Sequence, residues 1–165
     1  MSLSRLLRHL CATRAGTRRK FTDAVDSSVE SAIRAAESRT SGEIRFVIET
    51  ALEMGDLWAG STPRQRAQQV FSDLHIWNTE LRNGVLIYIS MADRDVEIVA
   101  DRGAAAVIPP ASWESVCRLM EDHFRARRFT EGAIGGVEAV AGLLERHFPR
   151  GATDRNELPN QPVLL

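Results

Sequence analysis

The sequence predicts an α/β fold in which a small mixed sheet lies between layers of helices. Two observations support this prediction. Segments with alternating apolar residues, typical of strands, are interleaved with segments whose apolar residues recur every three or four positions, typical of helices. After an opening helix the predicted order is strand, helix, strand, strand, helix, helix. The length of 165 residues suits one domain with a hydrophobic core.

The composition is that of an ordinary globular protein, with 44% hydrophobic and 26% charged residues. The formal net charge of −1 provides no overall field for nucleic acid, so we expect no nucleic-acid partner. Cys11 and Cys117 have no CxxC or Cys/His neighbourhood and are interpreted as free thiols of a reducing compartment. No apolar run is long enough to span a bilayer, and arginines interrupt any signal-like start. We therefore expect a cytoplasmic protein.

Residues 1–20 are predicted to form a basic amphipathic arm. The arm holds six cationic residues, and the first carboxylate of the chain is Asp23. Its leucines recur at helical spacing, so a short helix would carry leucine on one face and arginine on the other. These leucines are Leu3, Leu6, Leu7 and Leu10. Three interpretations remain open: a helix that docks its leucines on the domain, a peripheral contact with a membrane or protein partner, and an organelle transit peptide.

The folded domain is predicted to span residues 21–149. Its opening helix begins at Asp23, and Ser41-Gly42 ends that helix. Thr62-Pro63 is typical of a helix start, with a capping residue followed by proline at the first helical position. The predicted strands are residues 44–49, the almost continuously apolar 85–91, and 96–101.

Two further helices are predicted after the break at Pro109-Pro110. The second is predicted to be capped by Thr130 and to stop at Pro149. Gly135 and Gly136 weaken an isolated helix, so close backbone packing is expected there. The tail, residues 150–165, is polar and is predicted to be disordered.

The predicted topology brings three polar segments to one edge of the sheet. Strands 44–49 and 85–91 are joined through a helix and should be parallel, whereas 96–101 follows a tight hairpin and should be antiparallel. The start of the first strand, the start of the second and the end of the third then lie together. The segments are Ser41-Gly42-Glu43, Arg82-Asn83-Gly84 and Asp101-Arg102-Gly103.

Glu43, Asn83 and Asp101 are the candidate metal ligands of this edge. Their oxygens suit a hard divalent cation, Ca²⁺ or Mg²⁺. The neighbouring glycines would let the backbone approach a ligand closely. The alternative interpretation is that these are ordinary strand-end turns, where Gly, Asn and Asp are common. Asp93-Arg94-Asp95, at the opposite edge, is interpreted as a hairpin turn.

Several segments resemble the TPM domain over about residues 21–149. They are SGEIRFVIE, FSDLHIWNTELRNGVLIYISMADRDVEIVADRG, the later Trp113, and RRFTEGAIGGVEAVAGLLERHFP. The TPM domain occurs in a plant thylakoid lumen protein, in photosystem II repair factors, in a nematode receptor accessory protein and in many bacterial proteins. The resemblance implies a Rossmann-like fold, a three-layer α/β/α sandwich.

The functions that the resemblance implies fall into two classes. Some relatives act as accessory or repair factors for membrane proteins, which implies a ligand- or protein-interaction module associated with membrane-protein maintenance. A plant relative is described as an acid phosphatase and some bacterial relatives as binding calcium or magnesium, which implies a divalent-metal-dependent phosphatase acting on phosphomonoesters. The family often has an acidic residue where this chain has Arg82, so only weak Ca²⁺ or Mg²⁺ binding is expected.

Overall fold

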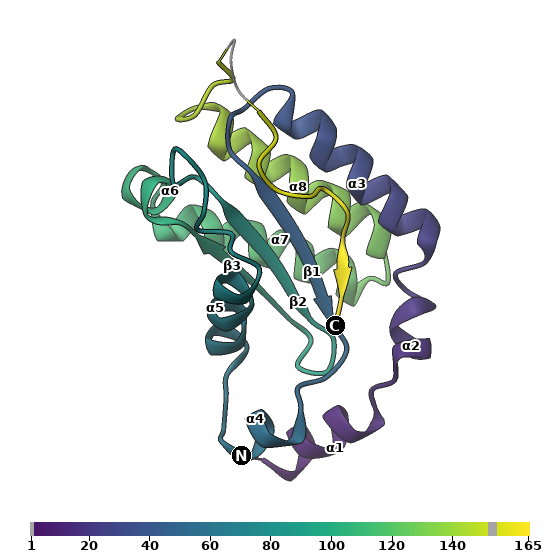
Figure 1. Cartoon of the computed structure of the whole chain (residues 1–165). Coiled ribbons are helices and arrows are strands. Elements are labelled where there is room, and N and C mark those ends of the chain that lie inside the picture. Colours follow the sequence, from purple (N-terminus) through teal and green to yellow (C-terminus); the bar gives the residue numbers. More distant parts are fainter. Residues whose placement is uncertain (1, 152–154) are drawn as a thin grey trace.

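A four-stranded mixed sheet forms the centre of the computed structural model, which describes residues 2–151 and 155–165 (Figure 1). The strand order is β3-β2-β1-β4. β1 (Ile44–Glu49) runs parallel to β2 (Val85–Ser90), and β3 (Asp95–Ala100) runs antiparallel to β2. These pairings confirm the predicted mixed sheet, and the three long strands lie within one residue of their predicted bounds.

Helices cover both faces of the sheet, which confirms the layered α/β architecture. One face packs against α3 (Asp23–Glu37), α7 (Pro110–Arg125) and α8 (Phe129–Glu145) in the larger core. The other face packs against α5 (Pro63–Asp73) in a smaller core (Figure 1). None of the helices in the described residues has the length and apolar character needed to cross a bilayer.

Four short helices complete the described part of the chain. They are α1 (Leu3–Cys11), α2 (Arg14–Arg18), α4 (Met54–Trp58) and α6 (Arg102–Val107). The sequence pattern does not predict α4 or α6, because one or two turns are too short to show a period. α8 begins at Phe129 with Arg128 as its N-cap residue, so the predicted cap at Thr130 is wrong.

Local sequence signals explain why α5 and α8 form where they do. Thr62 and Gln65 form a reciprocal capping box, with Pro63 in the first turn of α5. On α8, a Cβ atom at Gly136 would lie 2.2 Å from the sulfur of Met120. The close packing that the glycine pair predicts is therefore present at Gly136, where α7 crosses α8.

The N-terminal arm docks on the domain through its polar side rather than its leucines. Arg5 makes a two-point contact with Asp93, from Nε to Oδ1 at 2.8 Å and from Nη2 to Oδ2 at 2.9 Å. His9 Nε2 lies 3.2 Å from Asp93 Oδ1, and His9 Nδ1 accepts a hydrogen bond from the backbone N–H of Leu52. Although burial opposes it, hydrogen bonding to Arg5 and His9 holds the pKa of Asp93 below its usual value.

Three of the four leucines of the arm face solvent and Leu6 is only partly buried, so the interpretation that the arm docks through its leucine face is wrong. Leu3 is 72% exposed, Leu7 52% and Leu10 58%. The buried carboxylate of Asp93 explains this orientation, since leaving it without cationic partners costs more than exposing leucine side chains. Only one face of α1 can contact the domain, and it is the face whose Arg5 and His9 pair with Asp93.

The C-terminal tail is an edge strand, so the prediction of disorder is wrong for residues 155–165. β4 (Val163–Leu164) pairs in parallel with β1. The backbone N–H of Leu165 donates to the carbonyl of Ile48 at 2.9 Å, and that of Thr50 donates to Leu165 at 3.1 Å. Residues 152–154 of the predicted disordered tail lie outside the described residues.

Three buried side chains hold this tail, and we name Glu37, Glu43 and Arg45 the tail clamp. The Glu43 carboxylate accepts the backbone N–H groups of Glu157 at 3.1 Å and Leu158 at 3.0 Å. Glu37 accepts the side-chain amide of Asn160 at 2.6 Å. Arg45 donates to the carbonyls of Pro159 and of Gln161, the latter at 3.1 Å. Charged groups therefore anchor the middle of an extended segment whose Leu158, Val163 and Leu164 also pack against the two cores.

Burial and the nearby charge of Glu43 raise the pKa of Glu37 to about 7. Hydrogen bonds from the Ile44 N–H and from Asn160 act in the opposite direction, as does the charge of Arg150. The two carboxylates of the clamp thus repel each other when both are ionised. At neutral pH Glu37 carries a proton in a large fraction of molecules.

Replacement of Gly84 by alanine should destabilise the protein strongly. A Cβ atom at this position would lie 2.1 Å from the backbone carbonyl oxygen of Ile76, which cannot move easily because Ile76 is fully buried. We expect Gly84→Ala to lower the free energy of unfolding by about 3 kcal/mol. Gly142→Ala on α8 meets no atom within 4 Å and should raise it by up to about 1 kcal/mol. Urea unfolding measures both, and equal effects of the two would contradict the packing described.

Stability should depend on pH through Glu37. Its folded-state pKa of about 7 lies above the ordinary value of 4.5, so the folded state binds more protons between these pH values. The free energy of unfolding contributed by this group therefore falls as pH rises from about 4.5 to about 7. Glu37→Gln should remove up to about 3 kcal/mol of that decline.

Urea unfolding at pH 5 and pH 8 tests this expectation. The comparison of variant with parent cancels the titration of every group that does not interact with Glu37. The control is Glu53→Gln, since Glu53 is exposed and its side chain makes no capping hydrogen bond. If Glu37→Gln and the parent protein lose the same stability between the two pH values, Glu37 does not carry the effect.

Candidate functional site

The predicted polar edge forms at the start of β1 and β2 and the end of β3. The register pairs Ile44 with Val85 and Val85 with Ala100, so Glu43, Asn83 and Asp101 lie on neighbouring strands at the same edge. Two backbone hydrogen bonds join these neighbours. Val85 N–H donates to the carbonyl of Glu43 at 2.8 Å, and Asp101 N–H donates to that of Gly84 at 2.9 Å.

Each of the three predicted metal ligands also has a structural contact. Glu43 holds the tail through both carboxylate oxygens. Asp101 is the N-cap residue of α6 and accepts the backbone N–H of Arg102 at 2.7 Å. The side-chain amide of Asn83 donates to the carbonyl of Ser41 at 2.8 Å.

The glycines of the polar edge are approached by the chain itself. A Cβ atom at Gly103 would lie 2.6 Å from the carbonyl oxygens of Leu81 and Arg82. The carbonyl of Ile76 stands against Gly84 in the same way. Close backbone packing, rather than room for a ligand, accounts for glycine at these two positions.

Two oxygens of the polar edge are buried without a hydrogen-bond partner in the described part of the chain. They are Asn83 Oδ1 and Asp101 Oδ2. An orphaned amide oxygen and an orphaned carboxylate oxygen suit a hard cation or a bound water. Glu43, however, is engaged by the tail. Within residues 2–151 and 155–165 no group of three or more His, Cys, Asp or Glu side chains could hold a metal ion. The metal site therefore stays a prediction.

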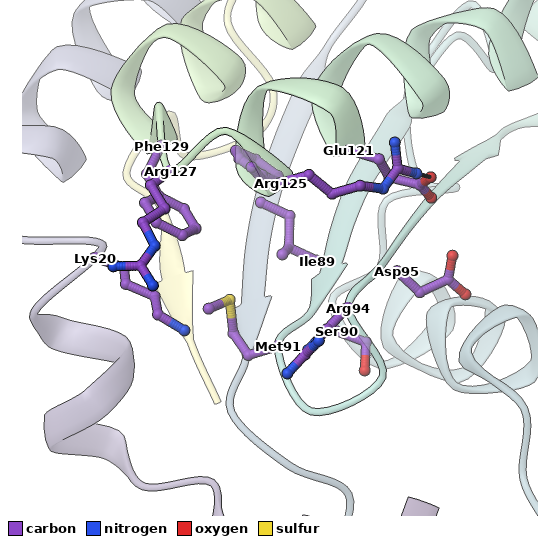
Figure 2. A pocket seen from close by; sticks show the side chains of 11 residues that line it. Lys20, Ile89, Ser90, Met91, Arg94, Asp95, Glu121, Arg125, Arg127 and Phe129 are labelled. Carbon is purple, nitrogen blue, oxygen red and sulfur yellow. Dashed lines mark hydrogen bonds and ion pairs between the residues drawn. The ribbon is translucent and has the colours of Figure 1, made fainter. Parts of the chain in front are cut away.

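A pocket of about 620 Å³ lies at the opposite end of the sheet, where β2 ends. The β2–β3 hairpin forms one side, the loop between α7 and α8 forms another, and the end of the N-terminal arm contributes Lys20 (Figure 2). The carboxyl end of parallel strands is the usual place for ligands in open α/β sheets. Its lining residues are Lys20, Ile89, Ser90, Met91, Arg94, Asp95, Glu121, Phe124, Arg125, Arg127 and Phe129.

Four of the lining residues are cations, and three of them have no ion-pair partner among the described residues. These three are Lys20, Arg94 and Arg127, and we name the site the cationic pocket. Arg125 differs, because it pairs with Glu121 at 2.8 Å and also with Asp122. Figure 2 shows Lys20 and Arg127 on the same side of the pocket, whereas Arg125 is turned toward Glu121.

Unusual backbone conformations present two of these cations. Arg94, in the β2–β3 turn, has φ of 57°, and Arg127, between α7 and α8, has φ of 60°. This left-handed region favours glycine and costs other residues about 1 kcal/mol or more each. Elsewhere in the described residues, His75 and Arg82 share it. Glycine would relieve the backbone at both turns, so either arginine side chain can be removed there without adding strain.

The apolar wall of the pocket is already packed. The rings of Phe124 and Phe129 stack with centroids 5.6 Å apart and an interplanar angle of 18°. Lys20 Nζ lies 5.6 Å from the centroid of the Phe129 ring. The Phe129 ring thus already contacts Phe124 and Lys20, so the pocket offers a ligand positive charge more than a free aromatic face.

The acidic side of the pocket can supply a proton near neutral pH. Burial, followed by the negative charges of Glu97 and Glu121, raises the pKa of Asp95 to about 6. A hydrogen bond between the carboxyl groups of Asp95 and Glu121 acts in the same direction. Asp95 therefore shares the pocket lining with the three cations, and its carboxyl is protonated at mildly acidic pH, where it can donate a proton to a bound anion.

Sequence patterns alone do not identify this pocket. Asp93-Arg94-Asp95 is a turn, as interpreted, but Asp93 anchors the arm while Arg94 and Asp95 line the pocket. The remaining cations come from distant segments that only the fold brings together. One local signal was available, the basic run from Arg125 to Arg128 that stands between two helices.

Comparison with known proteins agrees with the fold and the resemblance. The BA42 protein of the psychrophilic bacterium Bizionia argentinensis, solved by NMR, is 33% identical with a TM-score of 0.75, covering 87% of this chain and 94% of its own. Two N-terminal domains solved by NMR share the fold. The domain from P. gingivalis is 21% identical with a TM-score of 0.57, covering 79% of this chain and 82% of its own. The domain from Corynebacterium glutamicum is 12% identical with a TM-score of 0.56, covering 82% of this chain and 80% of its own. No curated protein matches the chain. Residues 18–143 match the TPM domain, and the chain belongs to this family.

Proposed function

We propose that the protein is a binding module for small phosphorylated ligands, which it holds in the cationic pocket. The observation that carries this proposal is the group of three cations, Lys20, Arg94 and Arg127, without ion-pair partners in the described residues. Following the family resemblance, we further propose that such a module serves the maintenance of membrane proteins. That assignment rests on the family alone.

Electrostatics favour a phosphate group as the occupant. Like charges gathered at one cavity repel each other, and a ligand with up to two negative charges relieves that repulsion. A guanidinium group presents donors in a planar fork that matches two phosphate oxygens, and lysine adds a point charge. The half-buried acidic side of the pocket disfavours a second anion, so one phosphate per site is expected.

Glycine substitution separates binding from folding in this pocket. Arg94→Gly removes a cation and relieves the left-handed backbone, so we expect binding of phenyl phosphate to weaken at least about tenfold while the melting temperature stays or rises. Arg127→Gly should behave in the same way. The measurement is an NMR titration of the full chain with phenyl phosphate, together with thermal unfolding of each variant.

Arg34→Ala is the matched control, because Arg34 is an exposed arginine on α3 that, in the described part of the chain, pairs with Glu30 alone. It should leave the affinity unchanged. Chemical-shift changes that avoid residues 89–95 and 121–129, or equal affinity in Arg94→Gly and the parent, would contradict the proposal.

A second candidate function is a divalent-metal-dependent acid phosphatase acting on phosphomonoesters. The observation that favours it is the raised pKa of Asp95 beside the cationic pocket. A protonated carboxyl there can donate to the leaving oxygen as its bond to phosphorus breaks, while water attacks phosphorus from the opposite side. Ca²⁺ or Mg²⁺ would have to enter the pocket with the substrate, because the orphaned oxygens of Asn83 and Asp101 lie at the other end of the sheet.

An assay with 4-nitrophenyl phosphate distinguishes the two candidates. The phosphatase requires turnover at mildly acidic pH that needs added Ca²⁺ or Mg²⁺ and falls by about a hundredfold in Asp95→Asn. Asp101→Asn, at the opposite end of the sheet, should leave turnover in the pocket unchanged, and a loss of activity in this variant would place the chemistry at the polar edge instead. If the protein binds phenyl phosphate but hydrolyses no 4-nitrophenyl phosphate under any of these conditions, the result supports the binding module and contradicts the phosphatase.

A further inference from the structure

The second unusual surface of the molecule is the outer face of the N-terminal arm. Leu3, Leu7 and Leu10 lie at i, i+4 and i+7 of α1, and each is at least half exposed. Their orientation is enforced from the other side of the helix, where Arg5 and His9 contact the buried carboxylate of Asp93. The helix cannot turn its leucines inward without breaking those contacts.

A second apolar pair stands on the neighbouring helix α4. Met54 and Trp58 occupy i and i+4, and Trp58 is 68% exposed. Two hydrogen bonds tie α1 to the chain that flanks α4. Leu52 N–H donates to His9 at 3.1 Å, and Arg5 donates to the carbonyl of Ser61 at 2.7 Å. Figure 1 shows α1 and α4 together at one end of the molecule.

The charge around α1 is positive. α1 contains no acidic residue, and Arg8, although it donates to the carbonyl of Ala92 and lies 3.9 Å from the Asp93 carboxylate, keeps 41% of its side chain exposed. Arg14 and Arg19 follow without ion-pair partners in the described residues. Glu53 and Asp56 at α4 reduce this charge, so apolar contact must contribute to any docking as much as charge does.

We infer that α1, with α4 beside it, docks the protein on the surface of a bilayer that contains anionic lipid. A helix with leucine on its outer face, arginine nearby and an exposed tryptophan next to it is the usual composition of an interfacial anchor. The positive charge complements anionic headgroups. Docking of this kind needs no further segment of the chain and leaves the cationic pocket as a separate site.

A second copy of this chain fits the same surface less well. Stable interfaces bury about 800 Å² on each partner, which is more than a nine-residue helix and two side chains of α4 can supply. Two copies would also bring their positive arms together, and like charges facing each other oppose association.

Vesicle binding by the full chain tests the inference. The probes are vesicles of phosphatidylcholine alone and of phosphatidylcholine mixed with phosphatidylglycerol. We expect the chain to sediment with the anionic vesicles, to bind neutral vesicles less, and to be released as salt screens the charges. Trp58 emission should shift to shorter wavelength on binding, and Trp58→Phe should remove that shift.

Leu7→Ser should lower the partition coefficient on anionic vesicles roughly fivefold or more. Its matched control is Leu81→Ser, since Leu81 is equally exposed but precedes β2 at the other end of the sheet. Both variants should keep the circular dichroism spectrum and melting temperature of the parent, because both side chains lie largely in solvent.

Three outcomes would overturn the inference. The first is no sedimentation with anionic vesicles at low salt. The second is an equal loss of binding in Leu7→Ser and Leu81→Ser. The third is a chain that does not bind vesicles but forms a concentration-dependent dimer in analytical ultracentrifugation, with Leu7→Ser dissociating that dimer. The leucines would then form a contact between copies.

Discussion

Much of this structure depends on how the chain satisfies the backbone hydrogen-bonding groups of β1 on the side away from β2. β1 is buried on both faces, and β2 satisfies the hydrogen-bonding groups of only one of its edges. Unpaired backbone groups on a buried strand cost free energy, and an open edge invites pairing with another chain. The chain closes this edge with its own tail as β4. The charged side chains of Glu37, Glu43 and Arg45 hold the backbone of this tail, while Leu158, Val163 and Leu164 pack against the two cores.

β1 also places a buried carboxylate, that of Glu49, on the face of the sheet covered by α5, and this carboxylate needs hydrogen-bond partners. Glu49 is buried there, and Arg66 of α5 satisfies it with two-point hydrogen bonds of 2.8–3.1 Å, while Tyr88 of β2 donates to the same carboxylate. The hydroxyl of Tyr88 has its pKa raised by burial and by this carboxylate. A buried ion pair of this kind is weak evidence for stability. Its effect is geometric, since it ties α5 to β1 and β2 at one register.

The two ends of the sheet therefore differ in chemistry. At the polar edge most side-chain donors and acceptors are used internally, by the tail through Glu43 and by the cap of α6 through Asp101. At the opposite end Asp93 is used to hold the arm, but the adjacent Arg94 is not neutralised within the described residues. Charge that the fold leaves unpaired is what a ligand can use, so the cationic pocket is the better supported site. The arm links the two surfaces, because Lys20 lines the pocket while Leu7 faces solvent.

The sequence by itself determined the parts of the fold that local patterns encode. Alternation and helical periodicity located the three long strands and the four long helices, and the order of these elements implied the pairing in the sheet. Only the tertiary structure decided the rest, because those features depend on partners far away in the chain. The leucines of α1 have the same periodicity whether they face the core or solvent, and Asp93 decided between the two. The tail has no strand pattern, and the open edge of β1 ordered it. Lys20, Arg94 and Arg127 became a site only when the fold placed three unrelated segments around one cavity.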